Sequence, residues 1–347
     1  MDFLKEIVKE IGDDYTVLAS EMAETEEYVD TGSYIFNALV SGSIFGGVSG
    51  NKITAIAGET STGKTFFSLA VVKNFLERHS DGYCIYFDTE AAITEQLLKS
   101  RGLTTPRLVI SNVVTVEEFR NKALKAVDIY LKKPEEERKP CMFVLDSLGM
   151  LSTEKEITDA LNDKQVRDMT KSQLVKGAFR MLTLKLGQAK IPLIVTNHTY
   201  DVIGSYVPTK EMGGGSGLKY AASTIIHLSK AKEKDGTEIV GNIIKAKTNK
   251  SRLTRENKEA AIRLFYDERG LDRYYGLLEL AEKYAIIKKV GNRYEIGGKK
   301  VYAKEVYKAP EKYFTEELMQ YIDAAAKLEF SYGGENTTDD SEESSES

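Results

Sequence analysis

One eight-residue segment constrains the fold of this chain more than any other part of the sequence. It matches the phosphate-loop pattern G-x-x-x-x-G-K-[ST] at every fixed position and consists of Gly58, Glu59, Thr60, Ser61, Thr62, Gly63, Lys64 and Thr65. An apolar run over 53–58 predicts a buried strand before it, and residues 65–78 predict a helix after it. Backbone N–H groups in such a turn bind phosphate together with the start of the helix. The segment therefore predicts a site for ATP.

Two side chains inside this segment and one outside it predict a site for Mg²⁺. In loops of this type the lysine, here Lys64, reaches the outer phosphates, and the following hydroxyl, here Thr65, ligates the metal. An acid linked to the magnesium is expected at the end of a second buried strand, and the apolar run 142–145 leads directly into Asp146. A carboxylate there either serves the metal or caps the next turn. We predict the metal role, because the phosphate loop already implies a bound magnesium.

Up to about residue 196 the chain alternates short apolar runs with helical patterns. Strands are predicted at 83–87, 142–145 and 193–196, and helices at 94–100, 116–131 and 171–188. This alternation indicates a parallel sheet covered on both faces. Three further strands follow without long helices between them, at 223–228, 239–247 and 260–265, with a turn at Asp235-Gly236. The predicted fold class is α/β, with a mostly parallel sheet extended by antiparallel strands.

Four parts are predicted along the chain. Residues 1–30 form a small helical segment with apolar residues at helical spacing, and residues 31–270 form the ATPase core. Residues 271–332 form a small α/β domain, with a helix at 277–284, a hairpin turning at Gly291-Asn292 and a helix at 315–328. Residues 333–347 contain six acidic residues and no basic ones, which predicts a disordered acidic tail.

Composition limits the partners of the chain without identifying them. The formal net charge of −5 excludes a uniformly basic nucleic-acid binder but permits a local basic surface. Between residues 230 and 258 there are nine basic and four acidic residues, most densely at Lys245, Lys247, Lys250 and Arg252. This stretch is either a solvated hairpin or a set of cations directed at phosphates. Those phosphates would belong to nucleic acid or to ATP on a neighbouring subunit.

The sequence gives no indication of a membrane, disulfide or zinc protein. Its two cysteines, Cys84 and Cys141, lie in apolar runs and are expected to be buried. The amino terminus is charged, and no apolar run approaches the roughly 20 residues that span a bilayer. We therefore expect a cytoplasmic protein that does not bind membranes.

Two polar residues at predicted strand ends are candidates for ATP hydrolysis, which needs a group that orients or deprotonates water. Glu90 follows the strand 83–87, at the sheet edge where ligands of parallel sheets bind. From spacing alone, Glu90 is equally well explained as a helix-capping carboxylate. His198 follows the strand 193–196 and is predicted to sense the terminal phosphate, although a single histidine is more often structural.

Two segments have no regular structure in this interpretation, 151–165 and 200–219. The second contains the string Met212-Gly213-Gly214-Gly215-Ser216-Gly217. Long loops in a compact domain are usually functional, and both leave the edge beside the predicted nucleotide, so we predict that they report its state to a second ligand. Glycines admit a phosphodiester backbone, and Tyr200, Tyr206 and Tyr220 are available for base stacking. The alternative is a mobile lid without a ligand.

Taken together, these segments resemble the RecA family of recombinases, most closely the strand-exchange proteins of T-even-type bacteriophages. The similarity covers about residues 30–330. It is carried by the segments GETSTGKT, FDTEAAIT, VLDSLGMLSTEKEITDALND, IPLIVTNHTY, MGGGSGLKYAA, KSR and YDERGLDRYYGLLELA. The loop segments and the strings NHTY and MGGG are more specific than the phosphate-loop pattern, which many ATPases share.

The resemblance implies a role for each candidate residue. Glu90 corresponds to the glutamate that activates water, and His198 stands where relatives often carry a glutamine that senses the terminal phosphate. Segments 151–165 and 200–218 correspond to two DNA-binding loops. The residues expected to contact DNA are Arg180, Gly213, Gly214, Gly215 and Ser216.

The resemblance also bears on assembly and on nucleotide choice. Lys250, assisted by Arg252, is expected to reach ATP on the next subunit. Residues 1–30 correspond to a segment that docks on an adjacent protomer and builds a helical filament. Relatives often place an aromatic ring against adenine where this chain has Leu97, so an apolar contact remains there but ring stacking is lost.

The function implied is that of an ATP-dependent DNA recombinase. It would hold single-stranded DNA in a helical filament, pair it with a homologous duplex and exchange strands, with single-strand-binding and mediator proteins as partners. The acidic tail would compete with DNA for the basic surface, or would only solubilise the chain. Two other classes share the ATPase core: a hexameric helicase motor, which typically brings an extra domain, and a recombination mediator that binds ATP without catalysis.

Overall fold

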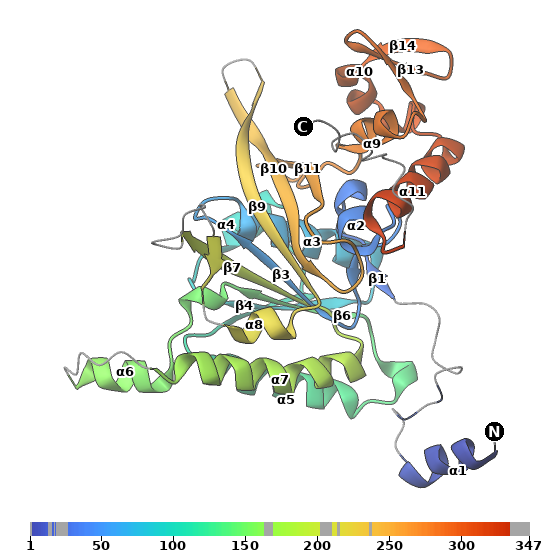
Figure 1. Ribbon diagram of the computed structural model, residues 1–347. Helices are drawn as coiled ribbons and strands as arrows, with labels where there is room; N and C mark the ends of the chain where they lie inside the picture. Colours follow the sequence, from blue (N-terminus) through green and yellow to red (C-terminus); the bar gives the residue numbers. More distant parts are fainter. Residues whose placement is uncertain are drawn as a thin grey trace, which may run out of the picture.

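The computed structural model describes residues 2–12, 16, 18, 27–162, 169–201, 210–213, 216–235 and 238–333. The predictions for Tyr206, Gly214, Gly215 and the tail from 334 onward therefore lie outside the described residues. Figure 1 shows a central sheet with helices on both faces, and a smaller region of helices and a hairpin formed by the carboxyl-terminal part of the chain.

The central sheet follows the strand order β11-β10-β9-β3-β7-β6-β4-β5. Its parallel strands are β3 (Ile53–Gly58), β4 (Tyr83–Asp88), β5 (Leu108–Asn112), β6 (Cys141–Asp146), β7 (Leu193–Asp201) and β9 (Thr224–Asp235). β10 (Glu238–Ser251) and β11 (Glu259–Phe265) continue the sheet in antiparallel orientation, and β8 (Lys210–Met212) pairs with the end of β7. The predicted α/β fold class, with its antiparallel extension, is confirmed.

The antiparallel extension begins one strand later than predicted. The sequence groups 223–228 with the antiparallel strands, but β9 lies parallel to β3, with Ala55 opposite Ile225. The reason is the connection that contains α8 (Ser216–Ala221), which returns the chain from the end of β7 to the other edge of the sheet before β9 begins. Parallel strands require a crossover of this kind.

Helices cover both faces of the sheet, as its buried parallel strands require. One face packs against α2 (Tyr34–Ser41), α3 (Lys64–Arg78) and α4 (Glu95–Ser100), around buried Phe36 and Phe67. The other face packs against α5 (Val116–Leu131) and α7 (Lys171–Ala189), around buried Phe119 and Phe179. Cys84 and Cys141 are both buried, as expected.

Several elements lie where the sequence interpretation expected none. β5 is a short edge strand that was missed, segment 151–165 contains α6 (Glu154–Leu161), and segment 200–219 contains β8 and most of α8. The signal for α6 was a capping box, in which Thr153 Oγ1 accepts the N–H of Glu156 and Glu156 Oε2 accepts the N–H of Thr153, both at 3.0 Å. The prediction of two segments without regular structure is therefore wrong for their described parts.

The carboxyl-terminal region contains the predicted helices and hairpin, together with a strand and a helix that were not predicted. Its elements are α9 (Leu277–Lys283), β12 (Lys288–Val290), β13 (Arg293–Ile296), β14 (Lys299–Tyr302), α10 (Ala303–Lys308) and α11 (Glu316–Phe330). Two carboxylates of α11 attach it to the core. Asp323 Oδ1 accepts the N–H of Ile44 at 2.9 Å, and Glu329 Oε1 accepts Lys258 Nζ at 2.9 Å.

The amino-terminal region begins with α1 (Asp2–Ile11), and β1 (Tyr28–Val29) then pairs with β2 (Val48–Ser49). The apolar residues of α1 fall on one stripe, and Phe3 is 71% exposed. Of the described helices, none combines the length and the apolar character that a membrane crossing requires.

A buried carboxylate, Asp30, holds the amino-terminal region to two other parts of the core. Its side chain is bonded by Asn37 Nδ2 at 3.1 Å, Arg78 Nη1 at 2.5 Å and Arg273 Nη2 at 2.8 Å. Burial opposes the charge, but the bonds and positive charge of Arg273, with bonds from Gly32 and Asn37, outweigh burial and lower the pKa of Asp30. Asp30 therefore contributes stability in its ionised form.

We expect Asp30→Asn to lower the free energy of unfolding by roughly 2–4 kcal/mol at pH 7, because it leaves Arg273 without its carboxylate. Since the folded pKa lies below the unfolded value of about 3.9, this contribution is complete above that pH and is lost as the pH falls through the folded pKa. Urea unfolding of both proteins between pH 7 and pH 3 measures it. A stability difference that stays constant over this range would contradict the ionised role of Asp30.

Candidate nucleotide-binding site

Parallel pairing brings the phosphate loop, Glu90, Asp146 and His198 to one edge of the sheet. Gly58 at the end of β3 lies opposite His198 of β7, and Asp88 at the end of β4 lies opposite Asp146 of β6. The phosphate loop and Glu90 follow these strand ends directly. Residues that are far apart in the sequence therefore meet at the edge where a nucleotide is predicted to bind.

The phosphate loop has a backbone shape that requires glycine at two positions. A Cβ atom at Gly58 would lie 2.8 Å from Thr62 Oγ1 and 2.9 Å from the carbonyl oxygen of Leu228. Gly63 has φ +89° at the start of α3, in the left-handed region that favours glycine. The loop is closed by a bond from Thr62 Oγ1 to the carbonyl of Glu59 at 2.9 Å. These contacts form the compact turn that the sequence pattern predicts.

The Lys64 ammonium lies inside this turn. Its Nζ donates to the carbonyl oxygens of Gly58 at 3.0 Å and Glu59 at 2.8 Å. Burial lowers the pKa of Lys64, and the charges of Asp146 and Glu90 partly oppose that shift. A buried cation surrounded by backbone dipoles and flanked by two acids is suited to bind an anion that enters the loop.

Asp146 is buried and held by two hydroxyl groups. Tyr86 Oη donates to its Oδ2 at 2.7 Å, and Thr196 Oγ1 donates to its Oδ1. Burial, followed by the Asp146 charge, raises the pKa of Tyr86, which keeps its hydroxyl as a donor. Each carboxylate oxygen keeps a free lone pair, and the Thr65 hydroxyl lines the same cavity. This set of oxygen donors fits Mg²⁺, which takes few protein ligands and keeps several waters.

Glu90 and His198 lie beside each other at this edge. Glu90 Oε1 is 3.6 Å from His198 Nε2 and accepts a hydrogen bond from Ser147 Oγ at 3.2 Å. The helix-capping alternative for Glu90 is wrong, because Thr94 caps α4 by accepting the N–H of Leu97 at 3.2 Å. Glu90 therefore keeps a half-exposed carboxylate that faces the cavity above the phosphate loop.

A cavity of about 620 Å³ covers the phosphate loop. Leu97 lines it, together with two aromatic rings that have no predicted role, Phe66 and Tyr266. Their centroids are 6.4 Å apart, and Tyr266 Oη donates to Asn242 Oδ1 at 2.8 Å. Phe66 directly follows the phosphate loop and Tyr266 follows β11, so only the folded sheet brings them together. They provide an apolar wall for a base.

The end of β7 joins this site to the glycine-rich segment. Asn197 Nδ2 donates to the carbonyl of Gly213 at 2.8 Å, and the N–H of Gly213 donates to the carbonyl of His198 at 3.0 Å. The N–H of His198 in turn donates to Asn197 Oδ1 at 2.9 Å. Gly213 is therefore hydrogen-bonded to His198, which lines the nucleotide cavity, and to Asn197, the residue before it in β7.

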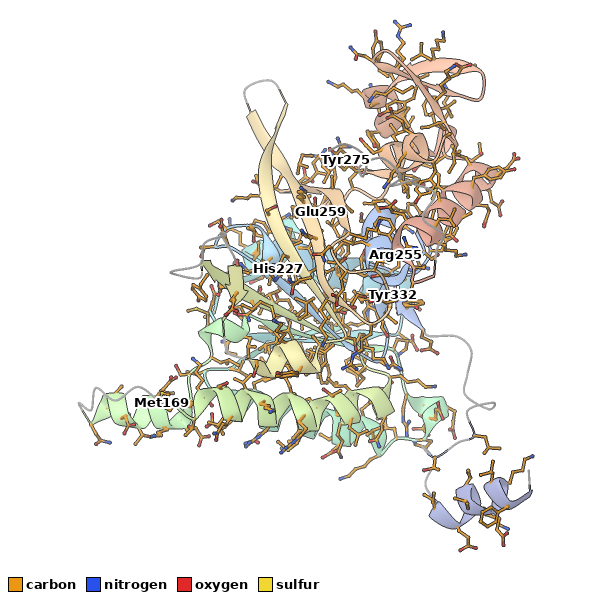
Figure 2. The ribbon with its side chains drawn as sticks, viewed as in Figure 1. Met169, His227, Arg255, Glu259, Tyr275 and Tyr332 are labelled. Carbon is orange, nitrogen blue, oxygen red and sulfur yellow. The ribbon has the colours of Figure 1, made fainter. Side chains whose placement is uncertain are left out.

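Downstream of this junction, α8 packs closely on α7. A Cβ atom at Gly217 would lie 2.7 Å from the backbone nitrogen of Lys176, so a glycine is needed for the two helices to approach. Ser216 begins α8 and is exposed, and Arg180 is exposed on α7. Two of the residues predicted to contact DNA, Arg180 and Ser216, therefore lie on the surface of the layer formed by α7 and α8. Figure 2 shows Met169, which is 78% exposed, near the end of the same layer.

The basic residues at 245–252 are divided between two ends of β10. Lys245 and Lys247 pair with Glu259 at 2.5 and 3.7 Å and line a cavity beside the phosphate loop. Lys250 lies opposite Ile225, toward the other edge of the sheet, and exposed Arg252 follows it. Lys250 and Arg252 therefore do not line the nucleotide cavity of their own chain.

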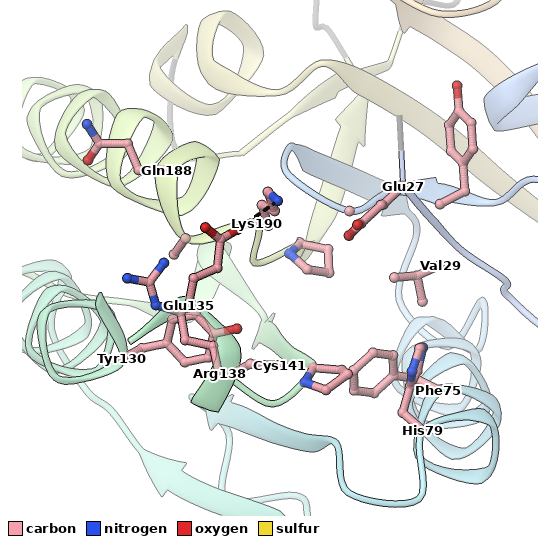
Figure 3. A pocket seen from close by; sticks show the side chains of 15 residues that line it. Glu27, Val29, Phe75, His79, Tyr130, Glu135, Arg138, Cys141, Gln188 and Lys190 are labelled. Atoms are coloured by element: carbon pink, nitrogen blue, oxygen red, sulfur yellow. Dashed lines mark hydrogen bonds and ion pairs between the residues drawn. The ribbon is translucent and has the colours of Figure 1, made fainter. Parts of the chain in front are cut away.

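A second cavity, of about 510 Å³, lies at that opposite edge (Figure 3). Its walls include Phe75, Tyr130 and Cys141, and the ion pair between Lys190 and Glu135, 3.2 Å long, lies beside it. None of the predicted site residues lines this cavity, so it does not compete with the phosphate loop as the nucleotide site.

Comparison with known proteins agrees with this geometry. The family model described as the RecA N-terminal domain matches residues 2–272. The chain is 32% identical over 274 residues to the recombination and repair protein of Enterobacteria phage T4, which covers 79% of this chain and 68% of the phage protein. It is 29% identical to protein RecA of Streptomyces rimosus, over 73% of this chain and 64% of that protein. It is 28% identical to protein RecA of Paracoccus denitrificans, over 74% of this chain and 69% of that protein.

The contact between α7 and α8 leads to a testable difference between two glycines. We expect Gly217→Ala to lower the free energy of unfolding by about 1–3 kcal/mol, because the methyl group meets backbone atoms that cannot move independently. A Cβ atom at Gly177 on α7 would meet no atom within 4 Å, so Gly177→Ala should raise stability by about 0.5–1 kcal/mol. Chemical unfolding of both variants measures this. Equal effects would contradict close packing at Gly217.

Proposed function

This chain belongs to the RecA family, and from that premise we propose that it is an ATP-dependent recombinase that forms filaments on single-stranded DNA and exchanges strands with a homologous duplex. One observation supports this most directly. The edge where the phosphate loop, Asp146, Glu90 and His198 converge is hydrogen-bonded to Gly213, the first glycine of the segment expected to bind DNA. Nucleotide state and DNA affinity would then depend on the same few backbone contacts.

In this proposal the phosphate loop binds the triphosphate of ATP through its N–H groups and Lys64. Thr65 and Asp146 are the residues that would hold Mg²⁺, which neutralises charge on the outer phosphates when bound. Leu97, Phe66 and Tyr266 receive the base. Glu90 orients the attacking water and accepts its proton, and His198, next to it, detects whether the terminal phosphate is present.

A neighbouring subunit completes the site. Lys250 and Arg252 lie away from the nucleotide cavity of their own chain, and their charge is suited to the phosphates of ATP on the next subunit. The exposed apolar stripe of α1 supplies a docking surface, in keeping with the assignment of residues 1–30 to assembly. The active ATPase is thus a filament interface between cores formed by residues 31–270.

Single-stranded DNA is held mainly through its phosphates, by Arg180 and by Gly213, Gly214, Gly215 and Ser216. Binding is therefore salt-dependent and largely indifferent to sequence, and base pairing reads homology. The acidic tail competes with DNA for the basic surface and slows entry of duplex DNA. Single-strand-binding and mediator proteins are the expected helpers, in the cytoplasm of the cell where the DNA is recombined. The relatives named above support this class over a helicase motor or a mediator.

ATPase rates with and without single-stranded DNA, combined with electron microscopy, test the proposal. We expect DNA to stimulate hydrolysis and to carry helical filaments. Glu90→Gln should lower kcat by about 10²–10⁴-fold, because the water loses its base, while filaments still form with ATP. Glu95→Gln is the matched control, since Glu95 is 80% exposed and pairs with Lys99 on the same helix. Closed rings without DNA stimulation would contradict the recombinase proposal.

A further inference from the structure

The Lys250 ammonium has a structural partner within its own subunit. Its Nζ donates to the carbonyl oxygens of Lys219 at 2.7 Å, Ala222 at 2.8 Å and, more weakly, Tyr220 at 3.4 Å. These carbonyls lie in the last turn of α8 and just beyond it, where a helix leaves its backbone acceptors without intrahelical partners. A cation at this end also complements the helix dipole. Lys250 therefore caps α8 from the neighbouring strand β10.

The capped helix is connected to the glycine-rich segment at its other end. α8 begins at Ser216, and Gly217 is pressed against the backbone of α7. At the other end of the segment, Gly213 is hydrogen-bonded to Asn197 and to His198, and His198 lines the nucleotide cavity. The glycine-rich segment is thus held at both ends, by β7 at one end and by α8 with its Lys250 cap at the other.

The same ammonium cannot serve two sites at once. A lysine has three N–H donors, and three carbonyls take them here. The acceptors are neutral, whereas hydrogen bonds to phosphate are charge-assisted and roughly twice as strong. Burial, and then the charge of Arg252, lower the pKa of Lys250, so its surroundings do not favour the charged form. An anion that reached Lys250 would compete effectively with the cap.

We propose that Lys250 is a positioning residue shared between two sites: it caps α8 in the free subunit, and it leaves α8 to bind nucleotide phosphates on the adjoining subunit when a filament forms. This inference rests on the proposed function, because it requires the intersubunit ATP contact. Uncapping releases the carboxyl end of α8 and with it one anchor of the glycine-rich segment. ATP on one subunit thereby changes the DNA-binding segment of the next.

Hydrogen exchange of the amides at 218–222 tests the cap in the free protein. Loss of the Lys250 bonds should speed hydrogen exchange at these amides. In Lys250→Met we expect the exchange rate of the Ala222 amide, which donates to the Leu218 carbonyl at 2.8 Å, to rise about tenfold. Lys250→Arg keeps donors and charge, so it should retain most of the protection and exclude general misfolding. Lys245→Met removes a charge from the same strand but pairs with Glu259, and it should leave these amides unchanged. Equal exchange in Lys250→Met and wild type would overturn the cap.

The second arm repeats the measurement with a non-hydrolysable ATP analogue and single-stranded DNA. Exchange at 218–222 in the wild type should rise toward the value of free Lys250→Met, and the Lys250→Met protein should show no further rise. If the amides of the wild type stay protected, or become more protected, in filaments, Lys250 does not leave α8 for the nucleotide and the proposal is overturned. Electron microscopy of the same samples separates the two proposals, because failure to form filaments contradicts the proposed function, whereas the free-protein arm still decides the cap.

Discussion

Parallel pairing of β7 with β3 and β6 is the constraint on which the rest of the structure depends. It sets His198 opposite Gly58 and carries the end of β7 past the phosphate loop. Side chains alternate along a strand, and three consecutive residues use this alternation. Thr196 reaches Asp146 and His198 lies beside Glu90, while Asn197 between them bonds Gly213. One strand therefore serves the nucleotide on one side and the glycine-rich segment on the other, and a shift of one residue in register would exchange these roles.

The parts of the site that follow from local chemistry could be predicted from the sequence. The phosphate loop, the strand before it and the helix after it occupy the expected residues. These three elements follow one another directly in the sequence, so the glycines of the turn mark all three. Asp146 ends β6 as predicted, since short buried strands have a clear apolar pattern. The strand predicted at 193–196 is longer, because β7 continues through polar residues to Asp201, so His198 lies inside the strand and not after it. β5 is hard to predict because it is a partly exposed edge strand. α6 is hard to predict because its composition is polar, and only the capping box at Thr153 marks its start.

Contacts between distant residues could not be predicted in this way. Glu90 meets His198 only because β4, β6 and β7 are neighbours, and Phe66 meets Tyr266 only because β11 closes the far side of the sheet. The basic residues of β10 form one cluster in the sequence, but an extended strand rises about 3.3 Å per residue, so Lys245 and Lys250 reach different sites. Sequence spacing could not reveal that Lys250 caps α8. The cap matters because Lys250 is expected to act on the neighbouring subunit, and the cap gives it a defined position within its own.

The central claim is that the end of β7 couples nucleotide state to DNA affinity, and the Asn197–Gly213 bond is its most direct test. The measurement is the affinity for a fluorescent single-stranded oligonucleotide, with an ATP analogue and with ADP, in the wild type and in Asn197→Ala. The account predicts that the ATP analogue tightens wild-type binding by at least about tenfold. In Asn197→Ala this ratio should approach one while nucleotide affinity is retained. An unchanged ratio in the variant would contradict the account.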